Sequence, residues 1–157
     1  VMSAREGLSF DTELKSDVAP LNGLVAEILA CGADVKFMRD PTRSGIAGVA
    51  NDLVAGAKLS VELDEAAIPL TGVVRHTAEM LGLDPLMVAN EGKVVVVVPK
   101  DDGEKVLAAC KTHVLGQEAA IIGQLTEAKP PLVELVTRIG GRRVVQRPYG
   151  EELPRIC

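Results

Sequence analysis

Apolar residues recur every three to four positions in several segments of the chain, which is the spacing of one face of an α-helix. Polar residues fill the positions between them, so we expect amphipathic helices that pack one face on a core. The expected helices cover residues 21–29, 46–54 and 73–81, and a fourth turns Val106, Leu107 and Cys110 inward.

Residues with strong preferences for helix ends flank these segments. Ser16 is available as the N-cap of the first helix and Gly32 as its end, and Thr71 is the expected N-cap of the third. Asp101 and Glu104 have the spacing of a capping box in front of the fourth helix, with Asp in place of the usual Ser or Thr. These signals predict where each helix begins or ends.

Other apolar segments are typical of strands. Residues 59–63 alternate apolar and polar side chains, as in a strand with one buried face, whereas residues 94–98 are apolar without alternation. An uninterrupted apolar strand is covered on both faces, so we expect 94–98 at the centre of a sheet. Further strands are expected at 35–38, 119–125 and 132–139, the last turning at Gly140-Gly141 into a hairpin with 142–147.

The order of helices, isolated strands and a hairpin predicts an α+β fold, or mixed α/β, with helices packed on a mixed sheet. A chain of 157 residues is about one domain long and can bury roughly 70% of its unfolded surface. We therefore expect one domain over residues 1–147. A tail over 148–157 follows, whose prolines and glycine favour an extended, flexible conformation.

Composition excludes several classes of function. The 22 acidic and 17 basic residues give a net charge of −5, the wrong sign for a surface that follows phosphate backbones, and aromatic residues are scarce. Nucleic acid is therefore not an expected partner. The aliphatic run at 94–98 is far shorter than the roughly 18 residues that span a bilayer, so no membrane is expected. The widely spaced cysteines and the lack of a secretory signal favour the cytoplasm.

A polar segment, R-D-P-T-R-S-G at residues 39–45, connects an expected strand to an expected helix. The amino end of a helix favours an anion, Thr42 and Ser44 add hydroxyl donors, and Arg43 can form paired hydrogen bonds with a phosphate. The segment therefore predicts a phosphate site. The alternative is a capped helix start with solvated arginines, since turns of this composition are common.

The segment A-N-E-G-K, residues 89–93, precedes the apolar strand expected at 94–98. Glu91 would therefore stand at the entrance of the strand rather than on a solvated helix face. A partly buried carboxylate accepts a proton more readily near neutral pH, as a general base does. The alternative is an Asn-Glu-Gly turn whose polar residues satisfy the backbone.

The chain ends on Cys157, in the segment P-Y-G-E-E-L-P-R-I-C. A thiol at the last residue of a flexible arm can reach two different active sites; the alternative is an accidental terminal cysteine. Cys31 and Cys110 fall in expected helices and are interpreted as small core residues. His76 and His113 have no companion at metal-ligand spacing, so surface or capping roles are expected and no metal site is predicted in this chain.

Three of these segments occur together in one protein family. M-R-D-P-T-R at 38–43, A-N-E-G-K at 89–93 and L-P-R-I-C at 153–157 resemble the HypE family of hydrogenase maturation factors, the carbamoyl dehydratases. The resemblance covers essentially the whole chain, which is similar to the C-terminal half of such proteins. The first motif is shared with ATP-using relatives such as aminoimidazole ribonucleotide (AIR) synthetase and selenophosphate synthetase. The implied fold is therefore that of the AIR synthetase C-terminal domain.

The chain departs from the family pattern in two respects. Ser44-Gly45 stands where the family usually has Gly-Gly. The N-terminal half is also missing, and in the family that half carries most of the ATP and Mg²⁺ contacts and the homodimer interface. The resemblance therefore implies a fragment that is inactive by itself.

The resemblance also implies a reaction on the tail of the protein. In the family, the carbamoyltransferase HypF places a carboxamide on the terminal cysteine, here Cys157. ATP is used to phosphorylate the carboxamide oxygen, and loss of phosphate leaves a thiocyanate. The cyano group passes to iron held by the HypC–HypD complex, for nickel–iron hydrogenases. By this resemblance Glu91 is the base that deprotonates the nitrogen, and the nucleotide-binding residues are Asp40, Thr42, Arg43, Ser44 and Asn90.

Two other functions stay open at this point. A carrier domain would only present Cys157 to partners while the missing half performs the chemistry. Glu91 distinguishes the two, because a carrier does not need a carboxylate there. A different synthetase of the same superfamily would not explain the terminal cysteine.

Overall fold

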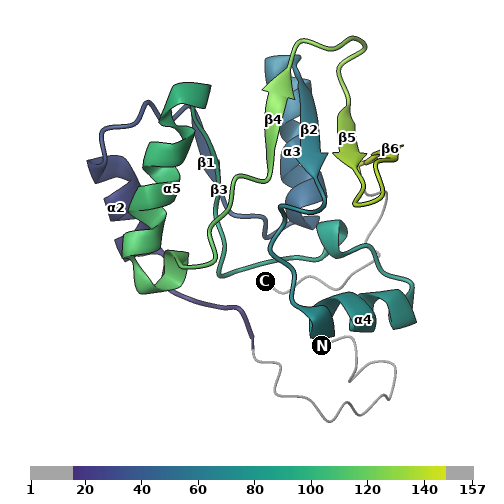
Figure 1. The fold of residues 1–157 in the computed structure, drawn as a ribbon, viewed down its shortest axis with the longest axis horizontal. Coiled ribbons are helices and arrows are strands. Elements are labelled where there is room, and N and C mark those ends of the chain that lie inside the picture. The colour runs from purple at the N-terminus through teal and green to yellow at the C-terminus, as the bar shows by residue number, and fades with distance from the viewer. Residues whose placement is uncertain (1–15, 148–157) are drawn as a thin grey trace.

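The chain builds two hydrophobic cores, each beside its own sheet. This computed structural model describes residues 16–147, in which a two-stranded sheet with two helices lies beside a four-stranded mixed sheet (Figure 1). The expected mixture of helices and a mixed sheet is thereby confirmed. The tail expected at 148–157 lies outside the described residues. Within 16–147, no helix is both long and apolar enough to cross a membrane.

The larger sheet has the strand order β4-β2-β5-β6. Strand β2 runs parallel to β5, and the other neighbouring pairs are antiparallel. Alternate residues of these strands pack against helix α3 (Gly45–Ala57), and each Val or Leu that is fully buried there stabilises the fold by about 1.5–3 kcal/mol. The strands are β2 (Ser60–Asp64), β4 (Gly123–Thr126), β5 (Val133–Val136) and β6 (Arg142–Val144). We call their buried cluster the sheet core: Ala47, Ala50, Val61, Leu63, Leu86, Val133, Leu135 and Val145.

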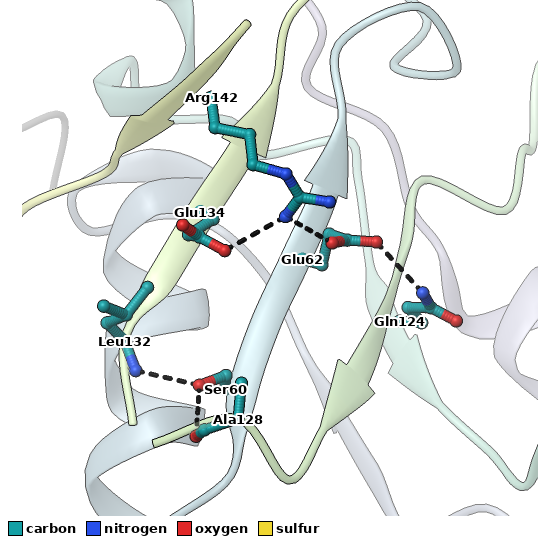
Figure 2. A network of polar contacts seen from close by, with 7 residues as sticks. All are labelled: Ser60, Glu62, Gln124, Ala128, Leu132, Glu134 and Arg142. Carbon is teal, nitrogen blue, oxygen red and sulfur yellow. Dashed lines mark hydrogen bonds and ion pairs between the residues drawn. The ribbon is translucent and has the colours of Figure 1, made fainter. Parts of the chain in front are cut away.

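The opposite face of this sheet carries polar side chains that contact one another from strand to strand (Figure 2). Arg142 Nη1 lies 2.7 Å from Glu62 Oε2 and 3.1 Å from Glu134 Oε2, and Gln124 donates to Glu62 Oε1 at 3.0 Å. Hydrogen bonds from Arg142 and Gln124 lower the pKa of the Glu62 carboxyl. The alternation at 59–63 therefore has the predicted cause, one apolar and one polar face.

The second cluster, the helix core, consists of Leu24, Ile28, Val106 and Cys110. These residues come from α2 (Asn22–Ala30) and α5 (Gly103–Thr112), which pack on the two-stranded sheet (Figure 1). That sheet pairs β1 (Phe37–Arg39) with β3 (Val95–Val97) in antiparallel orientation. Val94, Val96 and Val98 pack against the helix core.

The remaining helix, α4 (Gly72–Leu81), has the predicted ends. The hydroxyl oxygen of Thr71 accepts the N–H of Val74 at 3.4 Å, and Gly82 ends the helix with φ +65°. Gly32 likewise follows α2 with φ +75°, where glycine avoids the strain that a β-carbon brings. Short 3₁₀ helices lie at Pro85–Met87, Lys100–Asp102 and Val114–Gly116.

The chain passes between the two cores at the segments with candidate chemistry. It leaves the helix core after β1, builds α3, β2 and α4, and returns at β3. Residues 40–44 form the outward connection and residues 88–94 the return. The R-D-P-T-R-S-G and A-N-E-G-K segments therefore both lie where the chain crosses from one core to the other.

Two of the expected helix starts are wrong. The N-cap residue of α2 is Leu21 rather than Ser16, and that of α5 is Asp102, so Asp101 and Glu104 form no capping box. The carboxylate of Asp102 instead accepts a backbone N–H from the loop before β1, at 3.0 Å. The hydroxyl of Ser16 accepts the N–H of Val18 at 3.3 Å, so both predicted capping groups are engaged elsewhere than at their helix starts or make no cap hydrogen bond.

Several strand predictions need correction. The strand expected at 35–38 lies at 37–39, and the one expected at 142–147 ends at 144. The apolar strand expected at 94–98 is not central, because β3 pairs only with β1 among the described strands and its side chains are half-buried. The strands expected at 119–125 and 132–139 are shorter, at 123–126 and 133–136. The hairpin is confirmed, since β5 pairs with β6 through a turn in which Gly140 has φ +82°.

Candidate active site

The two motif segments meet at one end of the two-stranded sheet. Strand β1 ends at Arg39, which pairs with Val95 at the beginning of β3. Because the strands are antiparallel, the residues after β1 lie beside the residues before β3. The backbone N–H of Asn90 donates to the carbonyl of Pro41 at 3.1 Å and joins the two segments directly. The register of two short strands thus brings together motifs that are far apart in the sequence.

Thr42 lies between two carboxylates. Its Oγ1 is 2.5 Å from Asp40 Oδ2 and 3.4 Å from Oε2 of Glu91, a residue 49 positions later in the chain. A hydroxyl group has one proton to donate, and the shorter contact takes it. The Glu91 carboxylate therefore keeps most of its capacity to accept hydrogen bonds.

The other oxygen of Glu91, Oε1, is buried and has no hydrogen-bond partner among residues 16–147. Leaving such an atom unpaired costs about 1–3 kcal/mol or more, and native proteins keep few of them. An unpaired buried acceptor is typical of a site whose partner comes from a ligand or from another part of the protein. Glu91 Oε1 therefore has acceptor capacity that no group within residues 16–147 uses.

The start of α3 differs from an open anion-binding helix end. Ser44 and Gly45 both have left-handed backbone angles, φ +59° and +58°, and the Ser44 side chain does not cap the helix. Gly45 is buried, and a β-carbon there would collide with the carbonyl oxygens of Leu86 and Val88. That side of the helix start is packed by the chain itself. A phosphate would therefore meet the exposed side of the turn, where Arg43 lies.

The two arginines of the first motif have different surroundings. Arg39 Nη1 lies 2.6 Å from Asp52 Oδ2 on α3, and Arg147 Nη2 lies 2.8 Å from the other oxygen of the same carboxylate. Arg39 is therefore occupied in an ion pair within the fold. Arg43 is exposed, and no ion pair of its guanidinium is found within residues 16–147. Of the two, Arg43 is the one available to a ligand.

Asp17 contacts the Glu91 loop, which the sequence patterns did not predict. Lys93 Nζ lies 2.9 Å from Asp17 Oδ2, and a β-carbon at Gly92 would collide with the Asp17 carbonyl oxygen. The signal in the sequence is the glycine and lysine that follow Glu91. They indicate a close backbone approach and a charge partner, but not which residue supplies them.

The other candidate residues divide between core and surface. Cys110 is buried as expected, and burial, followed by the nearby Cys31, raises the pKa of its thiol. Cys31 packs against the helix core but is half-buried. His113 Nδ1 accepts the N–H of Leu115 at 3.2 Å, which confirms a capping role.

No group of three or more His, Cys, Asp or Glu side chains able to hold a metal occurs within 16–147. Cys157 lies outside that range.

Known proteins are similar to the chain over its whole length. The carbamoyl dehydratase HypE of Rhizobium leguminosarum bv. viciae is 49% identical over 158 residues, covering 100% of this chain and 45% of that protein. A solved HypE–HypF complex matches with a TM-score of 0.87 and 44% identity, over 94% of this chain and 48% of that one. A structure of HypE in complex with ATP matches with a TM-score of 0.90 and 35% identity, over 99% and 48%. The chain spans about half the length of these relatives.

The comparison at the family level agrees with the motifs and the fold. The family model described as AIR synthase related protein, C-terminal domain, matches residues 1–134. This range includes both connections between the two cores and therefore Thr42 and Glu91. The AIR synthetase-like fold expected from the sequence is confirmed, and the chain belongs to the C-terminal domain family of the AIR synthase related proteins.

Proposed function

We propose that this chain acts as the C-terminal half of an ATP-dependent carbamoyl dehydratase. The enzyme converts an S-carboxamide on Cys157 to a thiocyanate, which supplies the cyanide ligands of nickel–iron hydrogenases. Similarity to HypE proteins along the entire chain supports this function. In this proposal an N-terminal half supplies most contacts to ATP and Mg²⁺ and the homodimer interface.

The reaction removes the oxygen of the carboxamide and both protons of its nitrogen. ATP, the co-substrate, supplies a phosphoryl group to the carboxamide oxygen and leaves as ADP, and one N–H proton is lost. Removal of the second N–H proton then forms the carbon–nitrogen triple bond as the carbon–oxygen bond breaks and phosphate departs. Phosphate is a far better leaving group than the amide oxygen. The protein must therefore position the thiocarboxamide and accept protons from its nitrogen.

The observation that carries the proposal is the state of Glu91. Its Oε1 atom is buried without a partner, and its Oε2 atom has only a long contact to Thr42. A carboxylate in these surroundings gains from any N–H group brought to it, and a carboxamide nitrogen offers two. Glu91 is therefore the proposed base for the nitrogen of the modified Cys157.

The residues around Glu91 suit the phosphates of a nucleotide and a magnesium ion. Thr42 and the exposed Arg43 offer a hydroxyl and a guanidinium, and Ser44 adds a hydroxyl at the start of α3. Asp40 carries a carboxylate of the kind that Mg²⁺ prefers. No group of three or more His, Cys, Asp or Glu side chains able to hold a metal lies within 16–147, so the other ligands of the ion would come from the phosphates and the N-terminal half. The Asn90 amide donates to the Val88 carbonyl at 2.7 Å and thereby shapes the loop.

The partners follow from the chemistry of the tail. HypF transfers the carboxamide to Cys157, and the solved HypE–HypF complex of a similar protein supports that assignment. The HypC–HypD complex is the proposed acceptor of the cyano group. All of these steps are assigned to the cytoplasm, where a terminal thiol stays reduced.

We expect Glu91→Gln, made in the full-length dehydratase that contains this chain, to stop dehydration without stopping carbamoylation. Glutamine is nearly isosteric but takes no proton at neutral pH. A general base contributes about 10²–10⁴-fold, so single-turnover dehydration should slow by that factor at saturating ATP. Mass spectrometry of the carbamoylated protein follows the loss of one water over time.

Glu27→Gln is the matched control, because Glu27 is exposed on α2 and has no part in the site. It should dehydrate at the wild-type rate, and Cys157→Ala should accept no carboxamide. A wild-type rate in Glu91→Gln would contradict the proposal. The chain would then be a carrier that presents Cys157, with the chemistry assigned to the other half.

A further inference from the structure

The segment before α2 packs directly on the loop that carries Glu91. A β-carbon at Gly92 would collide with the carbonyl of Asp17 and would lie 3.3 Å from the backbone nitrogen of Ala19. Glycine is therefore required at 92 for two backbone segments to approach this closely. Residues 17–19 and the Glu91 loop are far apart in the sequence, so this contact is part of the tertiary fold.

The side chain of Asp17 adds a second attachment to the same loop. Its Oδ2 lies 2.9 Å from Lys93 Nζ. Partial burial acts to raise the pKa of the Asp17 carboxyl, but the hydrogen bond and charge of Lys93, with the N–H groups of Asp17 and Glu91, hold it below the usual value. The ionised carboxylate is thus held by Lys93, two positions after Glu91.

The loop is fixed on its other side as well. The N–H of Asn90 donates to the Pro41 carbonyl at 3.1 Å, and the Asn90 amide donates to the Val88 carbonyl at 2.7 Å. Pro41 of the first motif therefore contacts the loop before Glu91, and Asp17 contacts it after Glu91 through Lys93. The restrained loop carries the buried, unpaired Oε1 atom of Glu91.

We propose that Asp17 and Lys93 are positioning residues of the active site, which hold the backbone of Glu91 so that its carboxylate keeps the orientation that the reaction needs. This inference rests on the proposed dehydratase function. The ion pair is 38% exposed at Asp17 and 49% at Lys93. Pairs that exposed add little to stability, so the main effect of the pair should be on rate.

The test uses Asp17→Asn and Lys93→Met in the full-length dehydratase. A misplacement of about 1 Å can slow a reaction about 10²-fold, so we expect single-turnover dehydration to fall about 10–100-fold. The KM for ATP and the rate of carbamoylation should stay within about twofold of wild type. Lys93→Arg should retain most of the rate. The double variant Asp17→Asn/Lys93→Met should be no slower than the slower single variant, because both remove one interaction.

Lys36→Met is the matched control, since Lys36 pairs with Asp34 on the surface in the same manner but away from the site. Wild-type dehydration in Asp17→Asn and Lys93→Met, together with a slow Glu91→Gln, would overturn this inference and leave the proposed function intact. An equal loss of carbamoylation and dehydration would also overturn it, because the pair would then be only structural. A fast Glu91→Gln would instead reject the proposed function itself.

Discussion

At the scale of single residues, the start of α3 contains a strained position. Ser44 has φ +59°, a left-handed conformation that costs a residue with a β-carbon about 1–2 kcal/mol. The resembling family usually has glycine at this position. Gly48 also lacks room for a side chain, because a β-carbon there would lie 2.8 Å from the β-carbon of Ser44. The backbone turn between β1 and α3 is therefore tight. It holds Ser44 in a left-handed conformation that serine disfavours.

We expect Ser44→Gly to raise the free energy of unfolding by about 0.5–1 kcal/mol, because relief of the strain exceeds the entropy that glycine adds to the unfolded chain. Urea denaturation of the chain measures the change. Lys58 has φ +56°, so Lys58→Gly should also raise the free energy of unfolding. Glu79→Gly, on the exposed side of the last turn of α4, should lower the free energy of unfolding by up to about 1 kcal/mol. A loss in Ser44→Gly as large as that in Glu79→Gly would show that the serine side chain stabilises the turn.

The sequence identified most residues of the candidate site but not their interactions. Asp40, Thr42 and Glu91 stood out because polar residues at the ends of apolar strands indicate a site. Their convergence on one hydroxyl depends on the antiparallel register of β1 and β3, which links positions 49 apart. Asp17 could not be found, because its contact to Lys93 joins residues 76 apart through the packing of an irregular segment.

At the scale of elements, β3 shows what an apolar pattern can and cannot decide. The run of valines at 94–98 correctly indicated a strand with apolar surroundings on both faces. Valines 94, 96 and 98 pack toward the helix core, and Val95 and Val97 line a cavity shared with α3, β2 and β4. The strand is nevertheless not in the middle of a sheet. The half-buried valines face apolar side chains that belong to two cores rather than to neighbouring strands.

Helix α3 is tied to two other elements through Asp52. Its carboxylate contacts Arg39 at the end of β1 and Arg147 after β6, at 2.6 and 2.8 Å. The arginine side chains are 37% and 63% exposed, so Asp52→Asn should lower the free energy of unfolding by about 1 kcal/mol or less. Urea denaturation at low and high salt should show a smaller loss at high salt, because ions screen exposed pairs.

The two ion pairs can be separated by Arg39→Met and Arg147→Met. If Asp52 stabilises the fold only by attracting the two arginines, Asp52→Asn should not lower the free energy of unfolding any further in the variant that carries both methionines. A loss that persists there would assign the effect of Asp52 to the helix rather than to the ion pairs.

At the scale of the whole molecule, the candidate site depends on both cores at once. Thr42 lies on the connection from the helix core to the sheet core, and Glu91 lies on the return. The distance between these two side chains is therefore set by how the cores pack against each other. A cavity of about 70 Å³ remains between them, lined mainly by aliphatic residues and by none of the candidate site residues. A nucleotide is therefore expected at the connections and not in this cavity.

Under the proposed function, the described residues supply only one side of a nucleotide site, and the last prediction follows from that. The chain by itself should unfold cooperatively on heating, because it has two buried cores, yet release no phosphate from ATP above the background rate. Phosphoryl transfer requires groups that bind the nucleotide, coordinate the metal and align the acceptor. Thr42, Arg43 and two carboxylates meet these needs only in part. Calorimetry and a phosphate-release assay on the same sample test both statements. ATP turnover that disappears in Arg43→Met would show that this chain holds a complete nucleotide site and would remove the need for a second half.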